Sequence, residues 1–446
     1  MRNSRDFWRK YRWHWKCAEK TVLTEKLIHY FRQIPDYRCG REKRHDLGEM
    51  LVCVTLGFLC GRTTIRRSLK WCKTHLEELR KHMNLKYGIA SPSTITRMLN
   101  GIDEELALYA FMEWIGEIVE SRNTHLAIDG KALCGATEKT KGETTPMLLN
   151  VVETVRGLIL AQLPVDSKTN EITAIPELLK LLDISGSIVT IDAVGTQTAI
   201  MEQIHEQGGH FVLTVKKNQP EAYEEIHTFM DKLGAEDLKR KKGEAMDPGM
   251  KEFLEKYEEI SQMEKNRDRN EYRTCQICKD ASNLTKSQKE WPHVQSIGRI
   301  KQVRIPKEKD SQGNDVTPSK EEFLEKGSRR IPAPSAGEGA GKDVQCTALI
   351  SDLILTAEEL GSIKRMHWSI ENRLHHVLDD TFREDRSPAK KSRNNLSLIR
   401  KYAYNILRLA MYETGLANIM TEMMDCFCDN AALRERYVFQ GIASLY

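Results

Sequence analysis

Between residues 125 and 219 the sequence alternates short apolar runs with amphipathic segments, and this alternation constrains the fold more than any other feature. The runs "HLAIDG", "SIVTID" and "HFVLTV" have the length of buried strands, whereas "TAIPELLKLLDI" (173–184) and "AIMEQIHEQGG" (199–209) have the apolar spacing of helices. Between them, "MLLNVVETVRGLILAQLPV" (147–165) holds two β-rich runs around Arg156-Gly157, which predicts a hairpin. The order predicts an α/β domain with a mixed sheet.

Two of the predicted strands end in an aspartate. Asp129 follows "HLAI", and Asp192 follows "SIVTI". Ligands of open α/β sheets gather beyond the carboxyl ends of the strands, so both side chains are candidate site residues. Each aspartate taken alone could equally be a strand-end or helix-capping residue.

A third candidate acid, Glu371, lies in "MHWSIENRLHHVLDDTFRED" (366–385), whose apolar positions predict a helix. At helical spacing His367, Glu371 and His375 fall at i, i+4 and i+8 and share one face. For an arbitrary helix such a polar stripe is a solvated face. We expect Glu371, not Asp379 or Asp380, to be the third acid of a site.

Three carboxylates gathered by one sheet would repel one another, and one would hold its proton unless a cation compensated them. Mg²⁺ prefers oxygen ligands and keeps waters that phosphate oxygens can replace. Two such ions activate a water or a 3′-hydroxyl and stabilise the leaving oxygen. The pattern therefore favours two Mg²⁺ (or Mn²⁺) ions at Asp129, Asp192 and Glu371. A zinc site on the two histidines is the weaker alternative, because no cysteine or third histidine is placed to complete it.

The N-terminal part of the sequence indicates a helical, DNA-binding region. Apolar periodicity runs through 47–60 and 104–119, and "SPSTITRML" (91–99) has the serine and early proline of a capped helix start. The opening "RNSRDFWRKYRWHWK" mixes basic and aromatic residues, which suits phosphate contact and stacking, although a basic tail is the equal alternative. The short basic helices suit any helical bundle as well as a DNA-binding one.

Composition limits the class of protein only loosely. The net charge of +4 is too small to establish a nucleic-acid partner. The eleven cysteines are odd in number and scattered, which favours a reducing cytoplasm over a disulfide-bonded secreted protein, and Cys275 and Cys278 are expected to be strand residues. The longest apolar stretch (47–61) is too short to span a bilayer and predicts a buried helix, so we expect no membrane segment.

Four stretches together resemble the DDE-type insertion-sequence transposases of the ISAs type, which include the H-repeat-associated proteins of Rhs elements. They are "AIDGKAL", "VDSKTNEITAIPELLKLLDISGSIVTIDAVGTQ", "FVLTVKKNQP" and "HWSIENRLHHVLDDTFRED", and the likeness covers roughly residues 30 to 410. It implies a ribonuclease H-like core interrupted by a β insertion, with Asp129, Asp192 and Glu371 as catalytic, metal-binding acids. The expected partners are double-stranded DNA of element ends and target, bound by a homodimer associated with the nucleoid.

The changes in composition and apolar pattern, together with the resemblance, divide the chain into five regions. They are a helical DNA-binding domain (1–120), the first part of the core (121–220), a polar, β-containing insertion with a flexible segment at 307–343 (221–345), the second part of the core (346–412) and a C-terminal tail (413–446). The residues expected to contact DNA are Lys131, Lys216, Lys217, Arg365, His367, His375 and Arg383.

The sequence departs from the wider family in the helix of its third acid. A Tyr-x-x-Arg-x-x-x-Glu-x6-Lys signature is replaced by Lys364, His367 and Leu378 at the tyrosine, arginine and lysine positions. Arg365, His375 or Arg383 could supply the lost phosphate contacts. An active transposase, a metal-dependent nuclease that does not join strands and a silent DNA-binding relic therefore all stay open. A non-nucleic-acid α/β enzyme is disfavoured, since phosphate-loop and nucleophile-elbow motifs are lacking.

Overall fold

The computed structural model describes residues 24–133, 145–165, 171–265, 269–284, 291, 293–306, 308–309, 315–316 and 344–445. The basic, aromatic start of the chain and nearly all of the expected flexible segment at 307–343 lie outside these residues. The chain separates into two compact units. Of the described residues, the first unit holds Ile188–Arg365, and the second holds those up to Ser187 and those from Met366 onward.

The second unit begins with helices, as the sequence predicted. They are α2 (Leu27–Gln33), a 3-10 turn (Gly40–Arg44), α3 (Leu47–Leu59), α4 (Ile65–Thr74), α5 (Leu76–Leu79), α6 (Pro92–Gly101) and α7 (Glu104–Ile118). Every residue of α3 is buried, which confirms the predicted buried helix. Helix α6 begins as expected: the Ser91 hydroxyl accepts a hydrogen bond from the Thr94 amide, and Pro92 occupies the first helical position.

The predicted hairpin is confirmed in the same unit. Strands β2 (Met147–Glu153) and β3 (Leu158–Val165) pair antiparallel, and β1 (His125–Ala132) pairs with β2. The turn needs glycine at 157, because its φ is +77° and a Cβ there would lie 2.9 Å from the Arg408 guanidinium. Helix α8 (Glu171–Lys180) contacts β2 and β3 and begins close to the predicted position.

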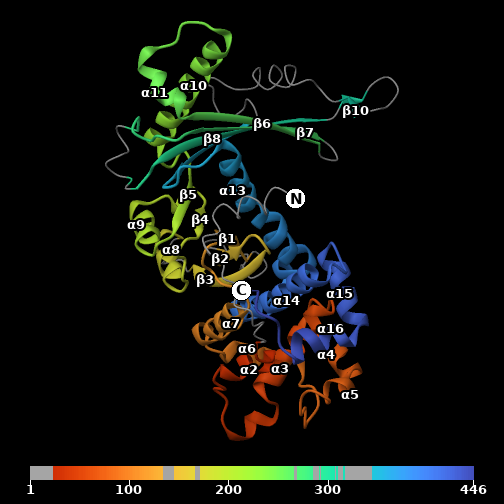
Figure 1. Ribbon diagram of the computed structural model, residues 1–446. Coiled ribbons are helices and arrows are strands. Elements are labelled where there is room, and N and C mark those ends of the chain that lie inside the picture. The colour runs from red at the N-terminus through yellow and green to blue at the C-terminus, as the bar shows by residue number, and fades with distance from the viewer. Residues whose placement is uncertain are drawn as a thin grey trace. The chain divides into compact units, whose positions relative to one another are not determined.

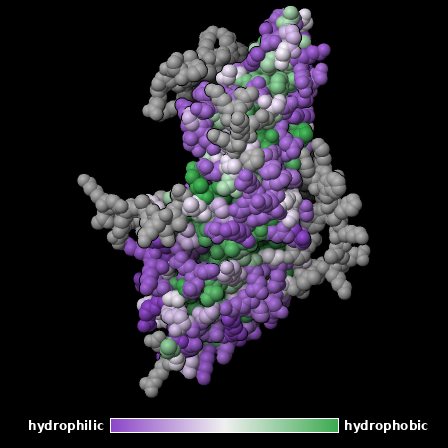
Figure 2. Space-filling view, turned by 90° about the vertical axis from the view of Figure 1, so that its left-hand side faces the viewer, coloured by the Kyte–Doolittle hydropathy of each residue, from purple (hydrophilic) through white to green (hydrophobic). Residues whose placement is uncertain are grey.

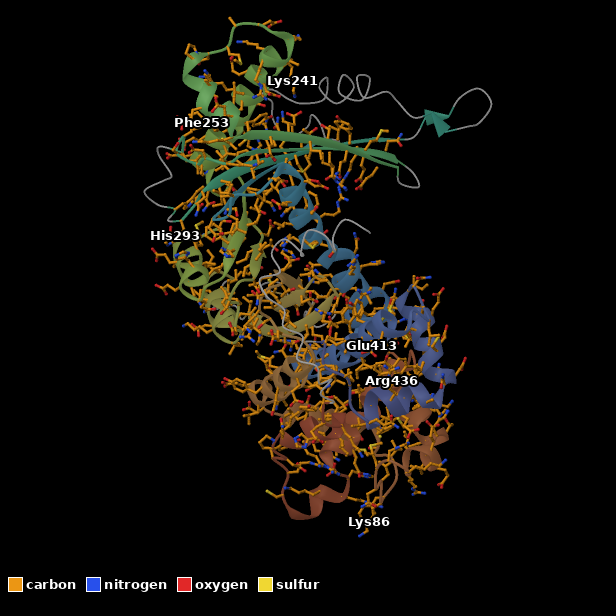
Figure 3. The ribbon with its side chains drawn as sticks, viewed as in Figure 1. Lys86, Lys241, Phe253, His293, Glu413 and Arg436 are labelled. Carbon is orange, nitrogen blue, oxygen red and sulfur yellow. The ribbon has the colours of Figure 1, made fainter. Side chains whose placement is uncertain are left out.

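The C-terminal helices complete this unit. They are α14 (Arg393–Thr414), α15 (Met420–Asp429) and α16 (Ala431–Arg434), followed by a π-helical turn (Glu435–Phe439). Helix α14 contacts α3, α7 and β3, and its fully buried Tyr402 packs its ring 4.8 Å from those of Phe31, Phe111 and Trp114. The π-helical turn is tied back by Arg436, which lies 2.7 Å from Glu413 of α14 (Figure 3). The helical bundle and the hairpin therefore share one core.

The first unit is built on a mixed sheet in the order β4-β5-β11-β8-β7-β6 (Figure 1). Its strands are β4 (Ile188–Ile191), β5 (His210–Val215), β6 (Tyr257–Lys265), β7 (Arg269–Cys278), β8 (Ser296–Pro306) and β11 (Val344–Ser351). Strands β4 and β5 run parallel and are linked by α9 (Thr198–Glu206), whereas the other pairs are antiparallel. A mixed sheet with flanking helices confirms the predicted α/β class. Cys275 and Cys278 lie on β7, as expected.

The region predicted as a polar, partly β insertion differs from expectation at its start. It begins with α10 (Pro220–Lys242), a helix of 23 residues that contacts β8 and β11. A short turn (Pro248–Met250) and α11 (Lys251–Glu255) follow, and β9 (Glu308–Lys309) and β10 (Asp315–Val316) form a separate small ribbon. Strands β6, β7 and β8 extend the sheet of β5 and β11 instead of forming a sheet of their own.

Among the described residues, no helix combines the length and the apolar character needed to cross a membrane. The face of the molecule drawn in Figure 2 is covered largely by hydrophilic residues, with apolar residues gathered in small patches. The apolar side chains of α3, α14 and the strands are instead buried in the core.

Candidate functional site

The first predicted acid, Asp129, lies within β1 and not at its end. Backbone pairing with β2 continues past Asp129↔Asn150 to Ala132↔Met147, so the strand is three residues longer than the sequence indicated. One Asp129 carboxylate oxygen accepts a hydrogen bond of 3.0 Å from the Gly130 amide, and the side chain is 26% exposed. A Cβ on Gly130 would lie 2.6 Å from a Glu171 carboxylate oxygen, so the first residue of α8 lies against β1 at Gly130, the residue that follows Asp129. Sequence reasoning missed Glu171, because its polar surroundings give no helical or strand signal before α8.

The third predicted acid, Glu371, lies where the backbone stops being an α-helix. Helix α13 (Ala357–Ile370) passes from the first unit into the second and continues as two π-helical turns, Glu371–His375 and Val377–Thr381. A π-helical turn closes its hydrogen bonds from i to i+5 instead of from i to i+4. His367 is buried and His375 is half-buried, whereas Glu371 is exposed, so the three side chains do not form the single exposed polar stripe that the sequence predicted.

Buried apolar residues fix the segment that carries Glu371. Ile370, Leu374 and Leu378 are all at most 2% exposed and anchor the two π-helical turns to the core of the second unit. The Tyr404 hydroxyl of α14 also donates a hydrogen bond of 2.8 Å to the Arg373 carbonyl oxygen. The backbone around Glu371 is thus held on both sides, while the carboxylate itself faces solvent.

Two contacts set the register between β1 and this segment. His375 Nδ1 lies 3.7 Å from Asp129 Oδ2, and Lys131 Nζ lies 2.5 Å from Asp379 Oδ1. Residues two apart on a strand point to the same face, so Asp129 and Lys131 meet side chains four apart on the π-helical segment. Glu371 precedes His375 by four residues on this segment. The structure therefore brings the elements of the first and third predicted acids together within one unit.

His375 does not form a charged pair with Asp129. Burial lowers the pKa of His375 to about 4, and the nearby charges of Lys131 and Lys401 act in the same direction. The 3.7 Å separation also exceeds a hydrogen bond. At neutral pH His375 is a neutral imidazole beside the carboxylate, and its buried Nε2 has no hydrogen-bond partner in the described part of the chain.

Lys131 belongs to a charge cluster, which we define as Lys131, Asp379, Glu384, Asp385 and Arg400. Lys131, Glu384 and Arg400 are buried, whereas Asp379 and Asp385 are about one-third exposed. The Lys131 ammonium also lies 3.2 Å from Glu384 and 3.5 Å from Asp385, and Arg400 lies 3.8 Å from Glu384. Burial lowers the pKa of Lys131, but the three acids outweigh it and raise the pKa above its usual value. At 4% exposure Lys131 faces the protein interior, so the structure favours a structural role over the DNA contact expected from the sequence.

A second buried lysine, Lys401 of α14, lies beside this cluster. Its ammonium donates to the side-chain oxygens of Asn150 and Gln162 on the hairpin strands. Complete burial lowers its pKa to about 7, against the opposing effect of Glu384. Together the two lysines connect β1, β2, β3 and α14 beneath the segment of Glu371.

The second predicted acid, Asp192, belongs to the first unit and directly follows β4. Because β4 and β5 are parallel, Asp192 and Lys216 follow neighbouring strand ends, and Lys216 Nζ lies 2.7 Å from Asp192 Oδ2. Burial raises the pKa of Asp192, but the hydrogen bond and charge of Lys216 outweigh it and hold the pKa below its usual value. The next residue, Lys217, is exposed. The carboxylate is thus ionised and already neutralised by a cation.

The remaining predicted DNA contacts differ in exposure. Arg365 is about half exposed, but its guanidinium lies 3.1 Å from Glu264 and donates to Gln262, both on β6. His367 is only 5% exposed. Arg383 is exposed and has a left-handed backbone, with φ of 52°, where the π-helical segment ends.

The donor chemistry of the three acids fits a hard divalent ion. Asp129, Asp192 and Glu371 offer carboxylate oxygens, which Mg²⁺ and Mn²⁺ prefer. Within the described residues, no three His, Cys, Asp or Glu side chains already lie close enough to hold a metal ion.

Comparisons with known proteins match both the N-terminal helices and the α/β region of the chain. A family model described as "Transposase DDE domain" matches residues 120–406, and one described as "DDE_Tnp_1-associated" matches residues 28–115. YbfL of Escherichia coli (strain K12) is 28% identical over 388 residues, which covers 86% of this chain and 90% of that protein. YhhI of the same strain, named "H repeat-associated putative transposase", shows the same identity and coverage. A protein from the dhlA 3′ region of Xanthobacter autotrophicus is 34% identical over 209 residues, which covers 45% of this chain and 69% of that protein.

These matches confirm the resemblance drawn from the sequence. The first family model spans Asp129, Asp192 and Glu371 together, and the second spans the helices from α2 through most of α7.

Proposed function

The chain belongs to the DDE transposase family, and on this premise we propose that it cleaves DNA at the ends of an insertion sequence and joins the ends to target DNA. The observation that carries the proposal is the pair of side-chain contacts between β1 and the π-helical segment. They bring the strand of Asp129 next to the segment that begins at Glu371. π-Helical turns occur frequently at functional sites.

In this proposal Asp129, Asp192 and Glu371 are the catalytic and metal-binding acids. Two Mg²⁺ or Mn²⁺ ions bound by them would supply an activated oxygen nucleophile and stabilise the leaving oxygen. The assignment of Glu371 is supported by its exposure, whereas Asp379 is engaged by buried Lys131. The assignment of Asp192 rests on its place directly after β4, at the carboxyl end of a strand in the α/β sheet.

The protein's own side chains have separate roles in this proposal. Lys216, which now contacts Asp192, would bind a DNA phosphate beside this carboxylate. Exposed Lys217, Arg365 and Arg383 would add phosphate contacts, and neutral His375 would lie beside Asp129 close to the DNA backbone. The same proposal keeps the ribonuclease H-like core at 121–220 and 346–412, the insertion at 221–345, a DNA-binding domain at 1–120 and a homodimer on DNA.

One observation favours a second candidate, a DNA-binding relic without cleavage activity. The three positions that depart from the family signature, Lys364, His367 and Leu378, are all at most 5% exposed. The Lys364 ammonium donates a hydrogen bond of 2.8 Å to the Thr214 hydroxyl. These three positions therefore cannot make the signature's phosphate contacts. In this chain such contacts would have to come from Arg365 and Arg383.

We expect cleavage to require a divalent metal ion while binding does not. Full-length protein and a plasmid carrying the element with both its ends are incubated with Mg²⁺, with Mn²⁺, or with a chelator. Without the metal the carboxylates repel the incoming phosphate, so cleavage should vanish while DNA binding in a gel-shift assay persists. Cleavage that continues in chelator would contradict the metal-dependent mechanism, and binding without cleavage in either metal would favour the relic.

A further inference from the structure

Helix α4 presents a row of cations that the sequence analysis did not single out. Its ten residues include Arg66, Arg67, Lys70 and Lys73, all exposed, and no acid. At 1.5 Å per residue the row spans about 10 Å, with neighbours three or four positions apart on one side of the helix. Such a row suits a ligand with several negative charges in line.

The opposite side of α4 fixes the helix firmly against α3. Ser68, Leu69, Trp71 and Cys72 are buried, and a Cβ on Gly57 of α3 would lie 2.1 Å from Ser68 Cβ. The connection from Cys60 to Thr64 is short and passes through Gly61, which has a φ of +72°. Two packed helices joined by a short, glycine-containing turn form the unit that helix-turn-helix proteins use to place their second helix against DNA.

A hollow of about 350 Å³ opens beside the same helix. It is lined by Gly61, Arg62, Arg67, Lys70, Trp71 and Thr74, and so by three cations and no carboxylate among the described residues. Trp71 is 5% exposed, and its buried indole Nε1 has no hydrogen-bond partner in the described part of the chain. An unsatisfied buried donor is costly unless a ligand or water completes it.

Neighbouring side chains hold the Trp71 indole in place. The Arg434 guanidinium lies 5.3 Å from its ring centre, and the His75 ring stacks on it at 4.1 Å. Arg434 is itself fixed by Glu78, at 2.8 and 3.0 Å. The donor and the three cations are therefore set on a rigid support.

We propose that α4 binds the phosphate backbone of duplex DNA, with one phosphate in the hollow beside Trp71 and others along Arg66, Lys70 and Lys73. This rests on the proposed function, which requires a DNA-binding region, and it places that region on a helix other than α6 and apart from the basic start of the chain. The row of exposed cations favours a backbone of repeated phosphates over a single small anion.

The test measures binding of the full-length protein to a labelled DNA duplex by fluorescence anisotropy over a range of salt concentrations. The variant Arg67→Gln/Lys70→Gln removes two exposed cations from the hollow, and neither side chain belongs to the core. Its affinity at low salt should fall at least about tenfold, and the slope of log K against log salt should fall by about two, because each phosphate contact contributes about 0.9.

The matched control is Lys180→Gln/Lys242→Gln, which removes the same charge from exposed sites on α8 and α10. It should bind nearly as tightly as the unaltered protein. If the α4 variant and the control lose the same affinity and slope, the interaction is general charge attraction and the α4 site is overturned. If the unaltered protein binds no duplex even at low salt, the proposed function itself fails.

The variant Trp71→Phe isolates the indole donor, since it keeps an aromatic ring in the core. Affinity should fall about two- to tenfold, the factor that one hydrogen bond carries. Inorganic phosphate, titrated as a competitor, should displace DNA more weakly from this variant than from the unaltered protein. Equal affinity and equal competition would remove Trp71 from the site.

Discussion

The Glu371→Gln variant is expected to fold and bind DNA normally while its DNA cleavage falls by at least about a hundredfold. Glutamine keeps the shape of the side chain but removes the charge that would hold a divalent ion, and such an ion supplies several kcal/mol of transition-state stabilisation. Glu371 is exposed, so the change should not disturb the packing of Ile370 and Leu374 beside it. Cleavage of end DNA in Mg²⁺ measures activity. A gel-shift assay and a thermal melt on the same samples measure DNA binding and folding.

The control is Asp380→Asn, another exposed acid on the same π-helical segment, which should cleave at nearly the normal rate. Asp379→Asn should instead lower stability, because Asp379 contacts buried Lys131. Normal cleavage by Glu371→Gln together with an inactive Asp380→Asn would mean that the family motif has been aligned two turns out of place.

The Lys131→Met variant is expected to lower the free energy of unfolding by about 3–5 kcal/mol, since removing one partner of a buried ion pair leaves uncompensated charge behind. Lys131 is the ammonium that lies within 3.5 Å of Asp379, Glu384 and Asp385. Methionine fills a similar volume, so the loss reports charge and not a cavity. Urea unfolding followed by circular dichroism gives the free energy.

The matched control for this experiment is Lys180→Met, which breaks the exposed pair with Glu177 on α8. Surface pairs contribute at most about 1 kcal/mol, so this variant should be nearly as stable as the unaltered protein. A Lys131→Met variant that is equally stable but defective in DNA binding would show that Lys131 contacts DNA after all, as the sequence had indicated.

The parts of the fold that the sequence predicted correctly are those with strong local signals. The hairpin of β2 and β3 follows from two β-rich runs around Gly157, and α6 follows from Ser91 and Pro92. Helix α10 had such a signal too: Ile226, Phe229 and Leu233 are buried at helical spacing, between Pro220 in the first turn and Gly243 at the end. The sequence did not predict this helix, because the high charge of its exposed side indicated a polar, β-containing insertion instead.

The environment of the candidate site could not be predicted locally. The change from α-helix to π-helix at Glu371 leaves the apolar pattern of Ile370, Leu374 and Leu378 intact, so the pattern does not reveal it. Lys131 looks like a surface lysine after a strand, because its acidic partners Asp379 and Glu384 come about 250 residues later in the chain. The contact of Asp192 with Lys216 could have been predicted from the sequence, because neighbouring parallel strands place the residues that follow them close together.

Joining of DNA strands is the measurement that tests the proposed function most directly. Full-length protein, Mg²⁺ and a pre-cut element end with a free 3′-hydroxyl are incubated with a circular target plasmid, and the junctions are sequenced. The proposal predicts end DNA covalently joined to the plasmid through that 3′-hydroxyl, at insertions that the Glu371→Gln variant does not produce. Plasmid that is nicked or cut but never joined would make the protein a nuclease. An unaltered plasmid with the end still tightly bound would show that it binds DNA without acting on it.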